Sequence, residues 1–365
     1  MRIAQVAPLY ESVPPKAYGG TERVVSWLTE ELVRLGHEVT LFGSGDSVTS
    51  ARLVAGCPQS LRLDPACVDQ LAHHYTMLEQ VFHEKDNFDI IHFHVDYLHF
   101  PMTRREQVVN VSTLHGRLDI PDLAPLYRTY AEMPVISISD AQREPLPSLN
   151  WLGTVYHGMP EDHYSFYPEA GNYLAFLGRT SPEKGLDQAI EIAKRAGMPL
   201  KIAAKIDKAD EDYFETVIKP LIDNSDIEFI GEIGYPGTNE FLGRAAALLF
   251  PINWPEPFGI VMMEAMACGT PVIAYPYGSV GEVMENEVTG YIVPDASAAV
   301  EALKNVGNLD RSRCRKSFEQ RFTANRMTRD YLKIYERILS RDSESVALSD
   351  GVLSWMKLTS PSSTT

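Results

Sequence analysis

The sequence predicts an α/β protein with two doubly wound, Rossmann-like parallel-sheet domains that face a central cleft. A chain of 365 residues suggests two domains rather than one. Buried strands alternate with amphipathic helices at the spacing of βαβ units, which implies parallel sheets. The composition shifts to Pro, Glu, Asp and Gly between residues 159 and 172. We therefore expect a first domain over residues 1–165 and a second over residues 170–322.

The first βαβ unit carries a glycine pair at the start of its helix. Residues 2–8 and 37–42 are predicted strands, and residues 21–35 a helix with Thr21 as its N-cap. Gly19 and Gly20 precede this helix, either as a tight turn or to let the backbone approach a phosphate or sugar. The dinucleotide fingerprint G-x-G-x-x-G is absent from the loop, so it predicts no dinucleotide site.

Two carboxylates mark a helix in the second half of the chain. The apolar run predicts a helix over residues 258–268, which ends at Gly269. Glu256 lies just before it, beside the free N–H groups of the first turn, where anions bind. Glu264 lies among methionines and alanines, on a helix that is apolar nearly all round. A buried carboxylate needs hydrogen-bond donors, which are either sugar or ribose hydroxyls, or a distant Arg or backbone N–H.

Two cations flank a turn at the end of the predicted strand 173–177. Arg179 and Lys184 suit a diphosphate, because Arg grips it with two hydrogen bonds and Lys acts as a point charge. The alternative is a solvated loop in which Glu183 pairs with one of them. The next strand end carries Lys205, which either leans toward the nucleotide or is solvated.

Several histidines follow predicted strands of the first domain. His92 and His94 share a strand face, and we expect packing and hydrogen bonding there, because no carboxylate or Cys completes a metal site. His115 ends the strand over residues 108–114, at the edge of the sheet where ligands bind. It is either a structural residue or part of the site, and His157 is a weaker candidate for the cleft.

Composition excludes several classes of function. The net charge of −16 and the isoelectric point of about 5.1 argue against a nucleic-acid-binding face. The four cysteines have no zinc spacing, which favours a reduced, cytoplasmic chain. No apolar run is long enough to span a membrane, and the N-terminus resembles a strand rather than a signal peptide.

The run E-P-F-G-I-V-M-M-E, from Glu256 to Glu264, resembles the E-x7-E signature of retaining nucleotide-sugar glycosyltransferases of family 4 (group 1, GT-B fold). The similarity covers nearly all of residues 1–340, including the P-x-x-Y-G-G-T-E loop and the R-x-x-x-x-K-G turn. It implies that Glu256 touches the donor sugar and Glu264 the ribose. The implied catalytic residues are His115, Arg179, Lys184 and Glu256. The implied donor-binding residues are Gly19, Gly20, Gly178, Ile233, Phe258, Gly259, Ile260 and Glu264.

This resemblance implies transfer of a hexose, with retention, from a nucleoside-diphosphate sugar to an unidentified hydroxyl acceptor. UDP-glucose is the favoured donor, and no cofactor is expected. Cations and the helix N-terminus stabilise the leaving diphosphate, so no metal is expected either. The alternatives are an epimerase or phosphorolytic enzyme on the same fold, and a non-catalytic nucleotide-sugar binding protein.

The resemblance also implies that a C-terminal helix over residues 323–340 crosses back to the first domain. Its predicted apolar stripe consists of Met327, Tyr331, Ile334, Tyr335 and Ile338. The Ser-rich residues 341–365 are predicted to be a disordered tail. Upstream, Glu282 matches a Glu common in the family and is expected to shape its own loop.

Overall fold

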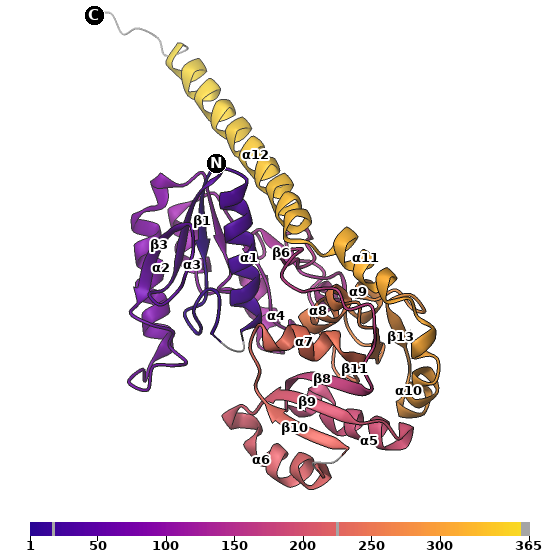
Figure 1. Ribbon diagram of the computed structural model, residues 1–365. Coiled ribbons are helices and arrows are strands. Elements are labelled where there is room, and N and C mark those ends of the chain that lie inside the picture. The colour runs from indigo at the N-terminus through magenta and orange to yellow at the C-terminus, as the bar shows by residue number, and fades with distance from the viewer. Residues whose placement is uncertain (17–18, 224–225, 359–365) are drawn as a thin grey trace, which may run out of the picture.

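The computed structural model describes residues 1–16, 19–223 and 226–358. Two parallel sheets, each flanked by helices, form two lobes, and the long C-terminal helix runs along the first of them (Figure 1). The two Rossmann-like domains that the sequence predicts are therefore confirmed. Within the described residues, no helix is both long and apolar enough to cross a membrane.

The first sheet has the strand order β3-β2-β1-β4-β5-β6-β7, with every neighbouring pair parallel. Its edge strand β3 lies in the segment 48–69, where the sequence gives no clear pattern. The strands are β1 (Arg2–Val6), β2 (Glu38–Ser44), β3 (Arg52–Cys57), β4 (Ile90–Phe93), β5 (Asn110–Thr113), β6 (Val135–Ser137) and β7 (Trp151–Thr154). The helices of this lobe are α1 (Gly20–Arg34), α2 (Gln70–His83), α3 (Phe100–Glu106) and α4 (Leu123–Thr129).

The second sheet has the order β10-β9-β8-β11-β12-β13 and is also parallel. Its strands are β8 (Tyr173–Arg179), β9 (Leu200–Lys205), β10 (Ile227–Gly231), β11 (Ala245–Phe250), β12 (Val272–Ala274) and β13 (Gly290–Ile292). The helices that follow are α5 (Leu186–Ala196), α6 (Glu211–Tyr213), α7 (Gly237–Gly243), α8 (Ile260–Cys268), α9 (Val280–Val283), α10 (Ala296–Leu303), α11 (Arg311–Arg321) and α12 (Ala324–Leu358).

The largest apolar core is continuous across the two lobes. Side chains of α1 and α12 pack with those of α8, and Phe258 contacts Phe322 with ring centroids 6.0 Å apart. The segment before the second domain runs beside the start of α12, since Met159 N–H donates to Phe322 O at 3.0 Å and Ala324 N–H to Met159 O at 2.8 Å. The lobes are thus joined by two crossing segments and by packing.

Helix α12 returns to the first domain and buries the predicted stripe. Met327, Tyr331 and Tyr335 are fully buried, and Ile334 is nearly so. The hydroxyl of Tyr335 lies 2.6 Å from His92 Nδ1, deep in the first sheet. The last helix therefore completes the core of the first domain.

The start of α1 differs from the prediction, and α10 has a carboxylate cap. Gly19, in an extended conformation, precedes α1, so Thr21 lies inside the helix rather than at its cap. Helix α10 is capped by Asp295, whose carboxylate accepts from the N–H of Ala298 at 2.9 Å. A carboxylate at a helix N-terminus gains from the helix dipole as well as from the hydrogen bond, which favours the aspartate.

Helix α12 extends to Leu358, so it runs into the segment 341–365, for which the disordered tail stays a prediction. Residues 340–358 contain no proline and a single glycine, so the backbone has no strong helix breaker there. Residues 359–365 lie outside the described residues.

Candidate active site

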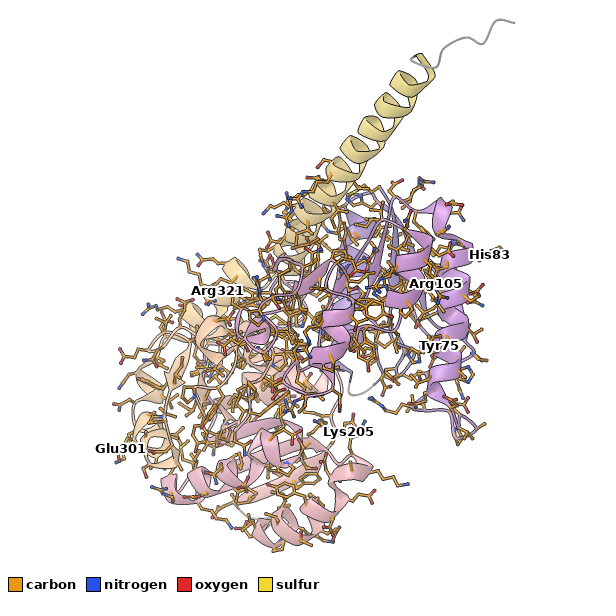
Figure 2. The ribbon with its side chains drawn as sticks, turned by 180° about the vertical axis from the view of Figure 1, so that it is seen from behind. Tyr75, His83, Arg105, Lys205, Glu301 and Arg321 are labelled. Atoms are coloured by element: carbon orange, nitrogen blue, oxygen red, sulfur yellow. The ribbon has the colours of Figure 1, made fainter. Side chains whose placement is uncertain are left out.

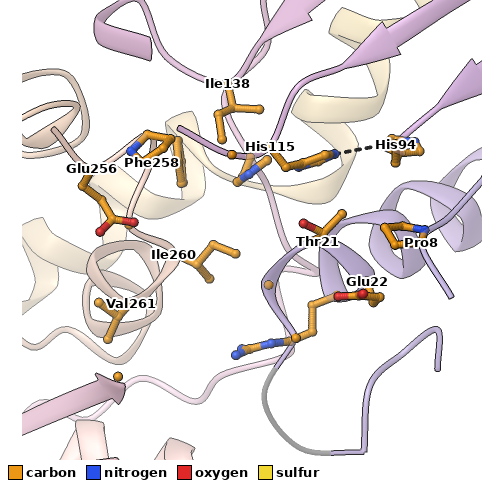
Figure 3. A pocket seen from close by; sticks show the side chains of 18 of the residues that line it. Pro8, Thr21, Glu22, His94, His115, Ile138, Glu256, Phe258, Ile260 and Val261 are labelled. Atoms are coloured by element: carbon orange, nitrogen blue, oxygen red, sulfur yellow. Dashed lines mark hydrogen bonds between the residues drawn. The ribbon is translucent and has the colours of Figure 1, made fainter. Parts of the chain in front are cut away.

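A cavity of about 410 Å³ lies between the two domains (Figure 3). The first domain contributes loops at the carboxyl ends of its strands, including Pro8, His94 and His115, and the N-terminal turn of α1. The second domain contributes the turn after β8 and the start of α8. The predicted site residues that line this cavity are Gly19, Gly20, His115, Gly178, Lys184, Glu256, Phe258, Gly259, Ile260 and Glu264. Ala17 and Tyr18 of the predicted glycine loop lie outside the described residues.

Lys184 and Glu256 form an ion pair in this cavity. Lys184 Nζ lies 2.5 Å from Glu256 Oε2, and both side chains are mostly buried. The ammonium also lies 5.1 Å from the ring centroid of Trp254. The turn that presents Lys184 depends on Gly185, whose φ is +68° and where an added Cβ would lie 2.0 Å from Pro251 O. Only glycine fits this close approach, so the position of Lys184 is fixed by the backbone.

Helix α8 points its N-terminus at the same cavity. Gly259 precedes it at φ +74°, and Gly269 ends it at φ +82°, as the sequence predicts. The helix begins at Ile260, two residues later than predicted, because Gly259 turns the chain through the left-handed region. The free N–H groups of its first turn favour an anion here. Phe258 anchors this end by packing on His157, with ring centroids 4.7 Å apart.

Glu264 is buried, with its side chain 3% exposed, and has two donors from outside its own helix. Arg23 Nη1 of α1 forms an ion pair with Oε1, and the hydroxyl of Tyr164 donates to the same oxygen at 3.0 Å. A distant arginine, which is one of the alternative donors expected for the buried Glu264, is thus present in the structure. Sequence reasoning missed both partners, because Arg23 lies 241 positions and Tyr164 lies 100 positions from Glu264.

The histidines of the first domain form a buried hydrogen-bonded network. Gln5 Nε2 donates to Tyr335, which leaves its Oε1 to accept from His94 Nε2 at 2.8 Å. His94 Nδ1 must then accept from His115 Nε2 at 2.9 Å (Figure 3). His92 bonds through both ring nitrogens to hydroxyl groups. Packing and hydrogen bonding, as predicted, account for His92 and His94.

This network fixes the protonation state of His115. Burial lowers the pKa of His115 to about 3, and it lowers the pKa values of His94 and His157 well below their usual range. The ring is therefore neutral at physiological pH. Because Nε2 carries the proton, Nδ1 is an acceptor, and no described residue bonds to it. His115 stacks on His157 at the back of the cavity, with centroids 5.4 Å apart.

Asp96 also lines the cavity. It follows β4 in the left-handed region, with φ +52°, and its surface opens into the cavity. No described residue donates a hydrogen bond to its carboxylate. Desolvation within the cleft raises the pKa of Asp96 to about 6, although part of its surface stays exposed.

Asp96→Asn is expected to stabilise the protein at pH 7–8 and to have no effect near pH 4. Because the pKa of Asp96 is raised, the folded state favours the protonated carboxyl group. Protonated Asp96 therefore contributes to the free energy of unfolding below about pH 4, and this contribution is lost as the pH rises to about 6. Asn tolerates the left-handed backbone, so the change adds no strain. Thermal unfolding across this pH range measures the effect, and a difference that does not vary with pH would contradict it.

A smaller cavity of about 50 Å³ adjoins the first and shares Arg23, Leu177 and Gly178 with it. Ile233, predicted to bind the donor, lines this smaller cavity together with Lys205. Lys205 lies on the side of the second lobe that faces the first (Figure 2). Its Nζ pairs with Asp207 Oδ1 at 3.1 Å, so this end of β9 is ordered by an ion pair.

Arg179 lines neither cavity. Its guanidinium lies 3.0 Å from Glu183, 3.5 Å from Asp207 and 3.7 Å from Asp210. The two aspartates follow the neighbouring strand β9, and their approach to Arg179 could not be read from the sequence. The predicted contact of Arg179 with a diphosphate therefore stays a prediction, whereas Lys184 faces the cavity directly.

Glu282 forms hydrogen bonds to the first domain and does not only shape its own loop, which corrects the expectation from the sequence. Its carboxylate accepts from the backbone N–H groups of Asp140 and Ala141, each at 2.7 Å, and from the hydroxyl of Tyr156 at 3.1 Å. This is a further contact between the domains, and Glu282 does not line the cavity. Among the described residues, no group of three or more His, Cys, Asp or Glu side chains is placed to hold a metal ion.

Two family models match the two halves of the chain. The model described as glycosyl transferases group 1 matches residues 164–320, and the model described as glycosyltransferase family 4 matches residues 18–144. The chain belongs to the group 1, family 4 glycosyltransferases. The cavity thus lies where the two matched halves of the glycosyltransferase meet.

Relatives of this glycosyltransferase align over most of its length. An uncharacterized glycosyltransferase of Methanocaldococcus jannaschii is 26% identical over 347 residues, which cover 82% of this chain and 87% of that one. The phosphatidyl-myo-inositol mannosyltransferase of Mycolicibacterium smegmatis is 26% identical over 355 residues, which cover 88% of each chain. The enzyme class is therefore glycosyltransferase, and of these two relatives only the second has a name that states what it transfers.

Solved structures agree with the fold of the glycosyltransferase. Sucrose-phosphate synthase from Thermosynechococcus elongatus has a TM-score of 0.77 at 19% identity, over 93% of this chain and 99% of that one. An Anabaena protein in complex with UDP and glucose has a TM-score of 0.70 at 18% identity, over 91% of this chain and 98% of that one. These similarities show the fold, with the two facing domains of GT-B glycosyltransferases.

Proposed function

We propose that this glycosyltransferase is a retaining hexosyltransferase that uses a nucleoside-diphosphate sugar, with UDP-glucose as the favoured donor, and needs no metal ion. The observation that carries the proposal is the meeting of Lys184, Glu256, Glu264 and the N-terminus of α8 in one cavity between the domains. The cation and the helix N-terminus suit a diphosphate. The two carboxylates suit the hydroxyl groups of a sugar and a ribose.

In this proposal the bond between the sugar C1 and the diphosphate breaks under electrostatic stabilisation. Lys184 and the N–H groups of α8 face the negative charge that grows on the leaving diphosphate, an effect typically worth several kcal/mol. The same stabilisation takes over the role that a metal ion has in other transferases. Glu256 holds the Lys184 ammonium in place and accepts from hydroxyl groups of the donor sugar.

The acceptor hydroxyl approaches from the first domain, where Asp96 and His115 line the cavity. Its oxygen forms the new bond to C1 on the face that the diphosphate leaves, and its proton passes to an oxygen of the leaving phosphate. This front-face route, which the family resemblance implies, needs no enzyme nucleophile. His115 is compatible with this route, because its ring is neutral and does not titrate near pH 7.

The donor assignment rests on the family resemblance and is supported by the Anabaena structure, which is a complex with UDP and glucose. The relative from Mycolicibacterium smegmatis is named as a mannosyltransferase, so the donor sugar varies among similar proteins. A panel that varies both the base and the sugar therefore tests the assignment.

The purified chain, in EDTA, is expected to be stabilised by UDP-glucose and to release UDP slowly from it. Thermal shift and nucleotide release are measured with UDP-, GDP-, ADP- and TDP-sugars. Release of free glucose with retained configuration, followed by NMR, supports a retaining transferase. A sugar nucleotide that changes without loss of the nucleotide would instead indicate an epimerase. Stabilisation that requires Mg²⁺ would overturn the metal-independent proposal.

A further inference from the structure

Glu264, the carboxylate expected to hold the donor's ribose, is held by groups from outside its own domain. Arg23 belongs to α1 of the first domain, and Tyr164 belongs to the segment that joins the two domains. Both bond to Oε1, and no described residue donates a hydrogen bond to Oε2. Since Glu264 lines the cavity, one oxygen is fixed and the other is left for a ligand.

The hydroxyl of Tyr164 has a single orientation. Its oxygen lies 3.0 Å from Glu264 Oε1 and 3.1 Å from Thr238 Oγ1. An ionised carboxylate only accepts, so the tyrosine donates to Glu264 and accepts from Thr238. Burial raises the pKa of Tyr164 well above its usual value, so the hydroxyl keeps its proton. The ring, which is 2% exposed, has no room to swing away.

Arg23 lies where the two cavities join, because it lines both of them. Its charge offsets that of Glu264, which would otherwise repel the diphosphate of an incoming donor. The two residues belong to different domains, so the ion pair exists only while the domains are close together. The orientation of the carboxylate therefore depends on closure of the cleft.

We propose that Arg23 and Tyr164 are positioning residues that couple closure of the cleft to recognition of the donor's ribose, an inference that rests on the proposed function. In the closed arrangement they hold Oε1, so that Oε2 accepts from a ribose hydroxyl. A nucleotide that bonds to Oε2 in turn stabilises the closed arrangement, because such a coupling is reciprocal. The second domain thus binds ribose well only with a residue of the first domain in place.

The test compares each ribonucleotide with its 2′-deoxy and 3′-deoxy forms by calorimetry, using UDP, GDP and ADP on the full chain. The wild type is expected to bind at least one ribonucleotide about tenfold or more tightly than a deoxy form, as for a hydrogen bond to a charged group. In Arg23→Gln and in Tyr164→Phe this ratio is expected to fall to about threefold or less. Arg23→Lys, which keeps the charge, is expected to restore part of it.

Glu282→Gln is the matched control, because it weakens a contact between the domains that lies outside the cavity. It is expected to leave the ribose ratio unchanged, even where both affinities fall. The radius of gyration from X-ray scattering is expected to decrease on nucleotide binding in the wild type and not in Arg23→Gln.

Two results would overturn the inference: a wild type that does not distinguish ribose from deoxyribose, or a ratio that Arg23→Gln and Tyr164→Phe both leave intact. In either case a nucleotide still binds, so the proposed function stands. Failure of the wild type to bind any of the nucleotides contradicts the proposed function itself. Tyr164→Phe removes one oxygen atom only, so it keeps the test valid if Arg23→Gln does not fold.

Discussion

Lys184→Ala is expected to lower kcat by about 10²–10³-fold with the donor that the panel identifies, while the thermal stability stays close to that of the wild type. The change removes the cation that faces the diphosphate. It also leaves the charge of Glu256 uncompensated, so the cavity becomes more negative where the leaving group gains charge. Steady-state kinetics with the donor and its hydrolysis as the readout measure the effect.

The control for this prediction is Lys201→Ala, which removes a half-exposed lysine of the same domain that lies 3.9 Å from Glu228. It is expected to leave turnover unchanged. The double variant Lys184→Ala with Glu256→Gln is expected to be less impaired than the two single effects combined, because the residues act as one pair. Near-normal turnover of Lys184→Ala would contradict the role of Lys184 in stabilising the leaving diphosphate.

Arg311→Met is expected to lower the free energy of unfolding by about 3–5 kcal/mol, the largest effect on stability that we predict. The Arg311 side chain is almost fully buried and has four neutral acceptors. They are the carbonyl oxygens of Tyr167, Ala245 and Gly243, at 2.7, 3.0 and 2.7 Å, and the hydroxyl of Thr270, at 2.7 Å. Methionine fills most of the space and leaves all four without this donor.

Urea unfolding of the full chain measures the change, and Arg313→Met is the control. Arg313 lies two residues further along α11 and is exposed, so its loss is expected to change the free energy of unfolding by less than about 0.5 kcal/mol. Burial lowers the pKa of Arg311, yet the guanidinium stays charged at neutral pH. Equal effects of the two substitutions would show that these four bonds contribute little.

Much of the fold could be predicted because local chemistry dictates it. Apolar runs predicted both sheets, and Gly269 ends α8 at positive φ, as expected from its place after the helix. The stripe of α12 was readable from its helical period. The edge strand β3 was not predicted, because its short apolar run is only partly buried and its pairing at the edge of the sheet depends on the tertiary fold.

The site could be predicted only where local motifs mark its residues. Glu256, Glu264 and Lys184 belong to short motifs, so their chemistry was readable where they stand. The partners of Glu264 are set by how the domains meet, and no local pattern marks Arg23 or Tyr164 as its donors. The same is true of Arg179, since the aspartates that surround it arrive from the next strand. What the sequence lacks is the relative placement of distant segments.

The return of α12 to the first sheet has a consequence for biosynthesis. Tyr335 bonds to His92 and Gln5, and Tyr331 bonds to Thr113, so these buried polar groups of the first domain have partners that are translated last. Tyr335 follows the end of the first domain by about 170 residues, which at roughly 5–20 residues per second takes roughly 10–30 s of translation. During that time the nascent first domain exposes an apolar groove and unsatisfied side chains. Chaperones that bind exposed apolar surface on the ribosome therefore have a defined interval, and a defined surface, on which to act.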